Sequence, residues 1–320
     1  MNTKGRSGSM IIRTSFRQAL PYFPAAVQTP LARLPEETVA QVQEIRLRRG
    51  KTVHLVTGGK ESVLTPAGTL SPREENGIRV TNDLIDTCFQ NLCAHSVHAV
   101  QHMLIQGYVI TAGGSRAGIC GTAVMQNGAV AGVRNISGIN LRIASERIGC
   151  GAEIAAKTGL LTMRGGLLLC GPPSSGKTTV LRDFCRILGD VHRVSVIDER
   201  GEIAAVQGGI PQFSLGACTD VFDGMPKAEG IAAATRVMSP EILVCDELGG
   251  EAETAALLAS MHSGVRLIAT AHAESIRGLY ARPQIRRLIE AGVFDTAVLL
   301  GTGEKTGQAA AIAQLTGVTR

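Results

Sequence analysis

The chain has 320 residues, of which 44% are hydrophobic, 18% are charged and 3% are aromatic, with no tryptophan. This composition excludes a largely disordered chain, and the length suggests two domains. No apolar run reaches the ~18 residues of a membrane-spanning helix, and the first apolar stretch is too short for a signal peptide. We therefore expect a cytoplasmic protein with an aliphatic core.

Positive charge is concentrated in the first half of the chain. Residues 1–150 hold 16 Lys and Arg against 9 Asp and Glu, whereas residues 151–320 hold 16 against 18. A basic half can bind nucleic acid, a membrane surface or an acidic partner. The basic cluster of Arg46, Arg48, Arg49 and Lys51 has no interleaved aromatic residues for base stacking, so no nucleic-acid partner is expected.

Residues 1–145 have the pattern of a small α+β domain. Apolar spacing over residues 16–34 indicates amphipathic helices, and alternation around Gly50 predicts a β-hairpin. A helix is expected over residues 83–102, followed by glycine-punctuated strands over residues 107–124. This mixture, without strict alternation of strands and helices, favours an α+β arrangement.

Residues 150–320 have a different pattern, in which short apolar runs alternate with helical segments, as in a parallel α/β sheet. The apolar run 166–170 leads into a glycine-rich loop and then a helix, the context that the G-x-x-x-x-G-K-[ST] motif requires. The glycines allow successive N–H groups to surround phosphate oxygens, Lys177 supplies charge, and the Thr178 hydroxyl can ligate Mg²⁺. The predicted nucleoside triphosphate site comprises Gly171, Pro172, Pro173, Ser174, Ser175, Gly176, Lys177, Thr178 and Thr179.

A second apolar strand, expected over residues 240–245, ends in the carboxylates Asp246 and Glu247. At the end of a parallel strand, Asp246 would hold Mg²⁺ and Glu247 would polarise water as a general base. An adjacent Asp-Glu pair is typical of ATPases, and the guanine-reading motif Asn-Lys-x-Asp is absent from the sequence. The predicted ligands are ATP and Mg²⁺.

Two further expected strands end in polar residues. Residues 194–198 lead into an acidic segment that includes Asp198, Glu199 and Glu202, and residues 265–270 lead to His272. The acidic segment would approach the metal or the γ-phosphate, and Glu199 is an alternative base. His272 would sense the γ-phosphate. The alternatives are a solvated strand end and a structural histidine.

These four strand ends, in this order, resemble the RecA-like core of the secretion ATPases that power type II and type IV secretion and pilus assembly. Segments 133–143, 196–203, 219–230 and 236–242 are more closely similar to the stage III sporulation AA family, and the resemblance covers residues 40–300. One departure is Asp246-Glu247-Leu-Gly-Gly where secretion ATPases have Gly-Glu-Ile-Arg-Asp. This departure leaves open whether Glu247 or Glu199 activates water, and we favour Glu247.

The resemblance implies an α/β fold in which a smaller α+β domain precedes a RecA-like P-loop ATPase core with a mostly parallel sheet. It implies a homo-oligomeric ring, expected to be a hexamer, at the inner face of the mother-cell membrane. Its partners would be membrane proteins of the stage III sporulation channel. In such rings an arginine from another domain or subunit often completes the site. The candidates here are Arg116, Arg142 and Arg236.

Two other functions stay open from the residues alone. A nucleic-acid-stimulated P-loop ATPase would use the basic half of the chain to hold single strands. An assembly scaffold would bind ATP without turning it over, although the intact set of Lys177, Asp246 and Glu247 favours an enzyme.

Overall fold

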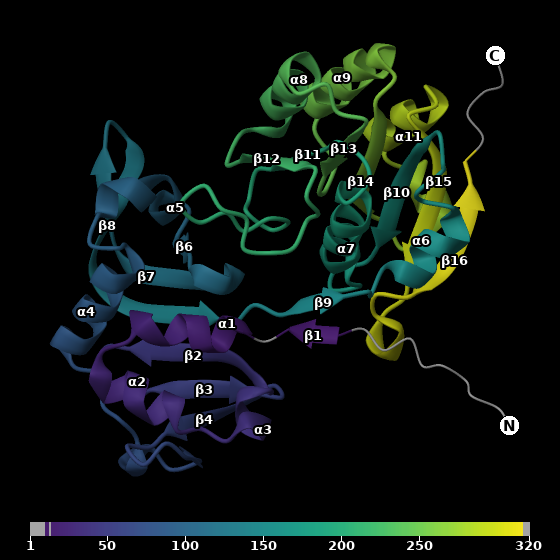
Figure 1. Cartoon of the computed structure of the whole chain (residues 1–320). Helices are drawn as coiled ribbons and strands as arrows, with labels where there is room; N and C mark the ends of the chain where they lie inside the picture. The colour runs from purple at the N-terminus through teal and green to yellow at the C-terminus, as the bar shows by residue number, and fades with distance from the viewer. Residues whose placement is uncertain (1–9, 13, 316–320) are drawn as a thin grey trace, which may run out of the picture. The chain divides into compact units, whose positions relative to one another are not determined.

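The computed structural model describes residues 10–12 and 14–315 (Figure 1). The chain divides into two compact units. Of the described residues, unit 1 contains 10–11, 147–206 and 213–315, and unit 2 contains 12, 14–146 and 207–212. None of the described helices is long and apolar enough to cross a membrane.

Unit 2 is built on a seven-stranded antiparallel sheet with the order β5-β4-β3-β2-β8-β7-β6. Its strands are β2 (Val42–Arg48), β3 (His54–Thr57), β4 (Lys60–Leu64), β5 (Leu70–Ser71), β6 (Tyr108–Ile110), β7 (Arg116–Gln126) and β8 (Ala129–Arg142). Its helical segments are α1 (Thr14–Ala19), η1 (Leu20–Tyr22), α2 (Ala25–Ala32), α3 (Glu36–Val39), η2 (Glu74–Asn76), α4 (Asn82–Leu92), η3 (Val97–Val100), α5 (Gln101–Ile105) and η4 (Ala112–Gly114). Strands β2 and β3 form the hairpin expected around Gly50.

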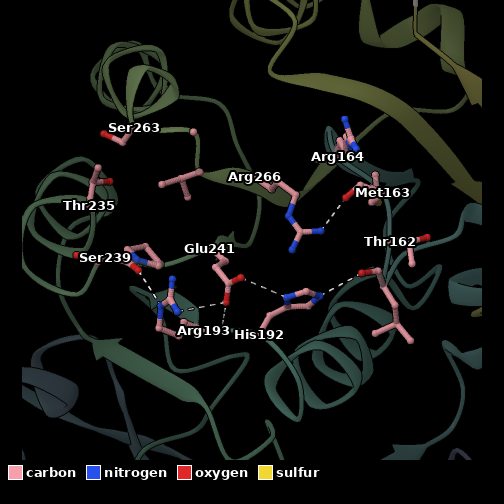
Figure 2. A pocket seen from close by; sticks show the side chains of 14 residues that line it. Thr162, Met163, Arg164, His192, Arg193, Thr235, Ser239, Glu241, Ser263 and Arg266 are labelled. Atoms are coloured by element: carbon pink, nitrogen blue, oxygen red, sulfur yellow. Dashed lines mark hydrogen bonds and ion pairs between the residues drawn. The ribbon is translucent and has the colours of Figure 1, made fainter.

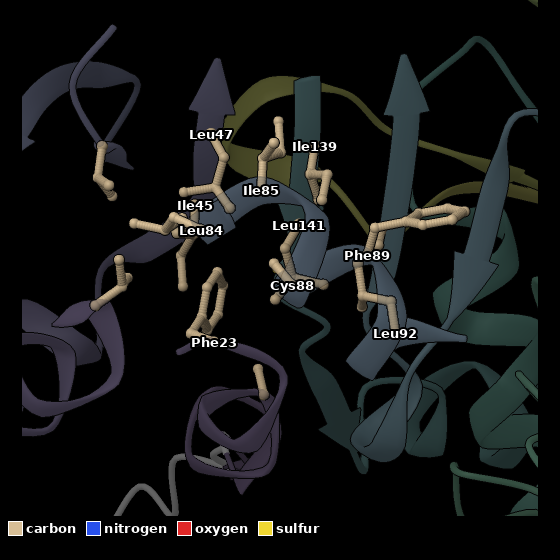
Figure 3. Close-up of a cluster of buried hydrophobic side chains, with 14 of the residues drawn as sticks. Phe23, Ile45, Leu47, Leu84, Ile85, Cys88, Phe89, Leu92, Ile139 and Leu141 are labelled. Carbon is tan, nitrogen blue, oxygen red and sulfur yellow. The ribbon is translucent and has the colours of Figure 1, made fainter. Parts of the chain in front are cut away.

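The core of unit 2 lies between one face of this sheet and helices α1, α2 and α4 (Figure 3). Alternation along β2 buries Ile45 and Leu47, while the intervening Arg46 stays half-buried. The Thr81 hydroxyl accepts the N–H of Leu84 and so begins α4. The burial of these aliphatic faces is the main stabilisation of the unit.

The single helix expected over residues 83–102 is wrong. Helix α4 ends at Leu92, and Ala94 and His95 adopt positive φ angles of 46° and 58°. A left-handed backbone cannot continue a right-handed helix. The remainder of the segment forms the short elements η3 and α5.

Unit 1 contains a seven-stranded sheet with the order β12-β11-β13-β14-β10-β15-β16. All neighbouring strands are parallel except β15 and β16. The strands are β10 (Gly166–Gly171), β11 (Val194–Asp198), β12 (Thr219–Asp223), β13 (Ile242–Cys245), β14 (Arg266–His272), β15 (Phe294–Leu300) and β16 (Ala309–Gln314). The helices are α6 (Ala152–Thr158), α7 (Lys177–Gly189), α8 (Lys227–Val237), α9 (Glu251–Ser260), α10 (Ile276–Leu279) and α11 (Pro283–Glu290), with η5 (Met261–Ser263) and η6 (Gly303–Lys305). A separate two-stranded sheet pairs β1 (Met10–Ile12) with β9 (Glu146–Ile148).

Strand β10 lies inside the unit 1 sheet, and every one of its residues is buried. Aliphatic clusters cover both faces of this sheet, as expected for parallel strands with helices on each side. Because the strands are parallel, their carboxyl ends meet at one edge, where ligands bind in open α/β sheets. This edge carries the strand ends that the sequence singles out.

Candidate nucleotide-binding site

The loop between β10 and α7 is a tight turn with unusual backbone angles. Ser174 and Gly176 have φ angles of 60° and 90°. A Cβ atom on Gly176 would lie 3.1 Å from the backbone nitrogen of Gly307, closer than most such contacts. The Gly307 N–H donates to the Ser175 carbonyl oxygen over 2.9 Å. The turn before β16 therefore holds this loop in place.

Lys177 is the first residue of α7, and its ammonium is folded back over the loop. Its Nζ donates hydrogen bonds of 2.9 Å to the carbonyl oxygens of both Gly171 and Pro172. Burial lowers the pKa of Lys177, and the carboxylate of Glu247 opposes that shift. The buried Ser175 hydroxyl has no hydrogen-bond partner among the described residues. Thr178 is half-buried in the first turn of the helix, where backbone N–H groups favour anions.

Asp246 and Glu247 directly follow β13, which is separated from β10 by β14 alone. Asp246 is 4% exposed, and its Oδ1 accepts no hydrogen bond from the described residues. Burial raises the pKa of Asp246 to about 6, with Lys227 acting in the opposite direction. Glu247 has a φ of 23°, which is unusual for a residue with a side chain, and its N–H donates to the Thr270 hydroxyl over 2.8 Å.

His272 joins the two strand ends. Its Nδ1 lies 3.3 Å from Lys177 Nζ, and its Nε2 lies 3.3 Å from Glu247 Oε1. The register supports this arrangement, because Gly171 of β10 is paired with His272 of β14. The structure thus brings together three residues that the sequence proposes for the site, from three adjacent strand ends.

The acidic segment after β11 is organised differently. Asp198 is fully buried, and its carboxylate accepts the backbone N–H groups of Glu202, Ile203 and Ala204 over 2.7–3.0 Å. Burial raises the pKa of Asp198, and these hydrogen bonds oppose the shift. Asp198 therefore stabilises the turn that follows it, and Glu199 lies half-buried at the start of that turn.

Lys227 belongs to the site geometrically but was not identified from the sequence. It is 6% exposed at the start of α8, and its Nζ donates to the Glu247 carbonyl oxygen over 2.8 Å. The same nitrogen lies 3.4 Å from Asp246 Oδ1 and 4.0 Å from Glu253 Oε1. Lysine is rarely buried without such partners. The sequence feature that could have identified Lys227 is its position within segment 219–230, which resembles the sporulation family.

The three candidate arginines lie in two places. Arg116 and Arg142 of unit 2 are directly opposite each other on β7 and β8. Arg142 Nε lies 3.4 Å from Glu44 Oε1, and the Arg116 guanidinium lies 3.9 Å above the Tyr108 ring. Arg236 is in the last turn of α8 in unit 1, about 14 Å along the helix from Lys227. It therefore lies at the opposite end of α8 from Lys227, the residue of this helix that contacts Asp246.

The sheet order, the loop after β10 and the carboxylates after β13 define the class: this is the fold of the RecA-like secretion ATPases. The pilus retraction motor PilT solved with bound ADP superposes with a TM-score of 0.55 at 16% identity, covering 82% of this chain and 76% of PilT. The ATPase DotB of Legionella pneumophila gives 0.52 at 14% identity, covering 84% and 76%. At these identities the likeness concerns the fold, and it confirms the predicted fold class.

Sequence similarity identifies the family within this class. The profile of the family "Sporulation stage III, protein AA" matches residues 27–319. Stage III sporulation protein AA of Bacillus subtilis (strain 168) is 34% identical over 292 residues, which cover 89% of this chain and 90% of that protein. The chain belongs to the stage III sporulation protein AA family, as the sequence motifs predicted.

Proposed function

We propose that the protein is a Mg²⁺-dependent ATPase that works as the motor of a secretion-like complex in sporulation. The observation that carries this proposal is the arrangement of Lys177, His272 and Glu247, with 3.3 Å between each neighbouring pair of side chains. This arrangement supports a single reaction centre that includes a phosphate-binding ammonium and a carboxylate base. The ADP bound to PilT, a protein of the same fold, supports a nucleotide ligand.

Two features of the described residues fit a nucleotide and its metal. The buried Ser175 hydroxyl and Asp246 Oδ1 make no hydrogen bond among these residues, although buried polar atoms normally do, and the Asp246 oxygen has only the ion-pair contact with Lys227 at 3.4 Å. The residues that would hold the phosphates are the loop 171–176 and Lys177, and those that would hold Mg²⁺ are Thr178 and Asp246. Mg²⁺ would neutralise charge on the phosphate oxygens.

Hydrolysis of ATP needs a general base, a group that stabilises the charge developing on the phosphate, and correct positioning of these groups. In the proposed reaction, the Glu247 carboxylate accepts a proton from the water that attacks the γ-phosphorus. The bond between the γ-phosphorus and the oxygen that joins it to the β-phosphate breaks, and ADP leaves with that oxygen. Lys177 neutralises developing charge on the phosphate. His272 positions both groups, because its two ring nitrogens face them. Glu199 is the second candidate for the base, but the contact between Glu247 and His272 favours Glu247.

The family relationship supports a ring assembly that acts with membrane proteins of the stage III sporulation channel, at the inner face of the mother-cell membrane. We propose a hexamer in which Arg116 or Arg142 of one subunit completes the site of another. Their placement directly opposite each other on neighbouring strands supports a shared role, because one phosphate group can accept hydrogen bonds from two adjacent guanidinium groups. Arg236 stays a third candidate.

The test is ATP turnover by the full chain, measured as phosphate release, together with binding of a fluorescent ADP analogue. We expect Lys177→Ala to lose binding and turnover. Glu247→Gln should retain binding and lose turnover by a factor on the order of 10²–10⁴. Lys157→Ala, at an exposed lysine paired with Glu153, is the matched control. Full turnover by Lys177→Ala would refute the proposal, and strong stimulation by single-stranded nucleic acid would favour the nucleic-acid-dependent alternative.

A mixing experiment tests the arginines. If Arg142 acts on a neighbouring subunit, Arg142→Ala and Lys177→Ala chains are each inactive alone, and their mixture recovers part of the activity. Recovery is expected because some interfaces combine an intact loop with an intact arginine. A mixture that stays as inactive as its components would contradict action between subunits.

A further inference from the structure

A second concave site lies on unit 1. It is at the edge of the sheet opposite the glycine-rich loop between β10 and α7. It is a cavity of about 640 Å³ formed by the segments that precede β10, β11, β13 and β14 (Figure 2). Because these strands are parallel, this edge carries their amino ends. The cavity is therefore distinct from the site formed by Lys177 and Glu247.

The lining of this cavity is basic. It contains Arg164, Arg193 and Arg266, with Glu241 as the single carboxylate among its lining residues. Three guanidinium groups against one carboxylate leave an excess of two positive charges, with His192 counted as neutral. A concave surface with an excess of one charge attracts ions of the other sign.

Glu241 is already engaged and does not neutralise the cavity. Its Oε2 accepts the backbone N–H of Arg193 over 2.9 Å, and that hydrogen bond is the main reason that the pKa of Glu241 is lowered. The Arg193 guanidinium lies 3.8 Å from the same carboxylate, and His192 Nδ1 lies 3.7 Å from its other oxygen. Glu241 thus ties together the segments before β11 and β13.

The other two arginines are left with free charge. Arg266 Nη1 donates to the Met163 carbonyl oxygen over 2.7 Å, which orients its guanidinium at the cavity wall. Arg164 is exposed on the same wall. In the part of the chain that the structure describes, neither Arg164 nor Arg266 has a carboxylate within ion-pair distance. Guanidinium groups bind carboxylates through paired N–H donors.

We propose that this cavity binds an acidic segment of a partner protein, with glutamate or aspartate side chains on Arg164 and Arg266. The wall also includes apolar residues, of which Leu161 is 46% exposed, so an extended peptide that mixes acidic and apolar side chains fits better than a small free anion. A second copy is disfavoured as partner, because the whole chain is basic, with 32 Lys and Arg against 27 Asp and Glu. The cavity would hold a partner protein while the candidate nucleotide-binding site, at the opposite edge of the sheet, stays accessible.

The test uses the full chain and fluorescein-labelled peptides in a fluorescence anisotropy titration at low ionic strength. The probe alternates Glu and Leu, and the control peptide has Gln in place of Glu. We expect the Glu peptide to bind, with Arg164→Glu weakening its affinity about tenfold or more. Arg266→Gln should also weaken it. Arg277→Glu, at an exposed arginine on α10 outside the cavity, should have little effect.

Three outcomes would overturn the proposal. One is equal affinity of Arg164→Glu and Arg277→Glu for the Glu peptide, and another is equal binding of the Gln peptide. The third is complete displacement of the peptide by inorganic phosphate at lower concentration, which would show a simple anion site. The unfolding temperature of each variant, measured in parallel, distinguishes a lost contact from a lost fold. None of these readouts depends on ATP turnover.

Discussion

The ammonium nitrogen of Lys227 lies 2.8 Å from the backbone carbonyl oxygen of Glu247 and donates a hydrogen bond to it. Glu247 has a positive φ, so its peptide group needs a partner that holds this conformation. The buried lysine provides that partner and also lies 3.4 Å from Asp246. A residue outside the known motif thereby holds the backbone of Glu247 and contacts the carboxylate of Asp246.

Replacing Lys227 by methionine is expected to lower the free energy of unfolding by about 3 kcal/mol, because Asp246 would keep a buried charge without its partner. ATP turnover should fall about tenfold or more, since Glu247 would lose its support. Urea denaturation and phosphate release measure the two effects. Lys157→Met, at an exposed ion pair, is the control. Unchanged turnover in a folded Lys227→Met chain would show that the lysine is only structural.

The raised pKa of Asp246 predicts a specific pH dependence of stability. Its folded pKa of about 6 lies above the ordinary value of 3.8, so the folded protein binds this proton more tightly than the unfolded chain. The stabilisation is complete below about pH 4 and is lost as the pH rises through 6. Relative to Asp246→Asn, the wild type should gain about 1.4 kcal/mol per pH unit on acidification between pH 6 and 4. Urea denaturation without nucleotide or metal measures this difference, and a constant difference would contradict it.

Gly176→Ala is expected to weaken nucleotide binding, whereas a glycine replacement of similar backbone cost elsewhere in the chain should not. The substitution costs about 1–2 kcal/mol because φ is 90°, and the new methyl group would also press on Gly307. Gly292→Ala has a similar φ of 74° with open space around the new methyl, so it isolates the backbone cost. Fluorescent ADP titration and urea denaturation of both variants separate the two effects. Equal ADP affinity would contradict the expectation.

Thiol accessibility tests the packing of both units. Cys120 and Cys218 are exposed, whereas Cys170 is buried in β10 and burial raises its pKa to about 11. In the native protein, a thiol reagent such as Ellman's reagent should react rapidly with the two exposed cysteines and slowly with the buried ones. All eight cysteines should react in denaturant. Rapid labelling of five or more in the native state would contradict the described core.

The sequence predicts the β10 strand, the loop after it and the carboxylates after β13 because each is a local pattern. An apolar run, closely spaced glycines and a strand-ending Asp-Glu pair can be recognised without knowing the fold. The buried position of Lys227 is not local. It depends on α8 beginning beside the end of β13, twenty residues further along the chain.

Two other features were predicted wrongly because they depend on the backbone conformation of a turn and not on the residue types alone. Asp198 looked like a ligand from its strand-end position, yet its carboxylate is occupied by three backbone N–H groups of the following turn. The break after α4 occurs at Ala94 and His95, and alanine is not a residue that normally marks a left-handed turn. Tertiary contacts override local preference at such positions.

The chain crosses between the two units more than once, and this affects whether a single cut can separate them. Residues 207–212 belong to unit 2, although the chain on either side of them belongs to unit 1. The Gln207 side chain donates to the Tyr22 hydroxyl over 3.0 Å, and the Gly113 N–H donates to the Gln212 side chain over 2.9 Å. A protease that cuts once near residue 147 would leave fragments that still share a folded unit. Such a nicked protein would migrate as two bands in denaturing gels and as one particle in native chromatography.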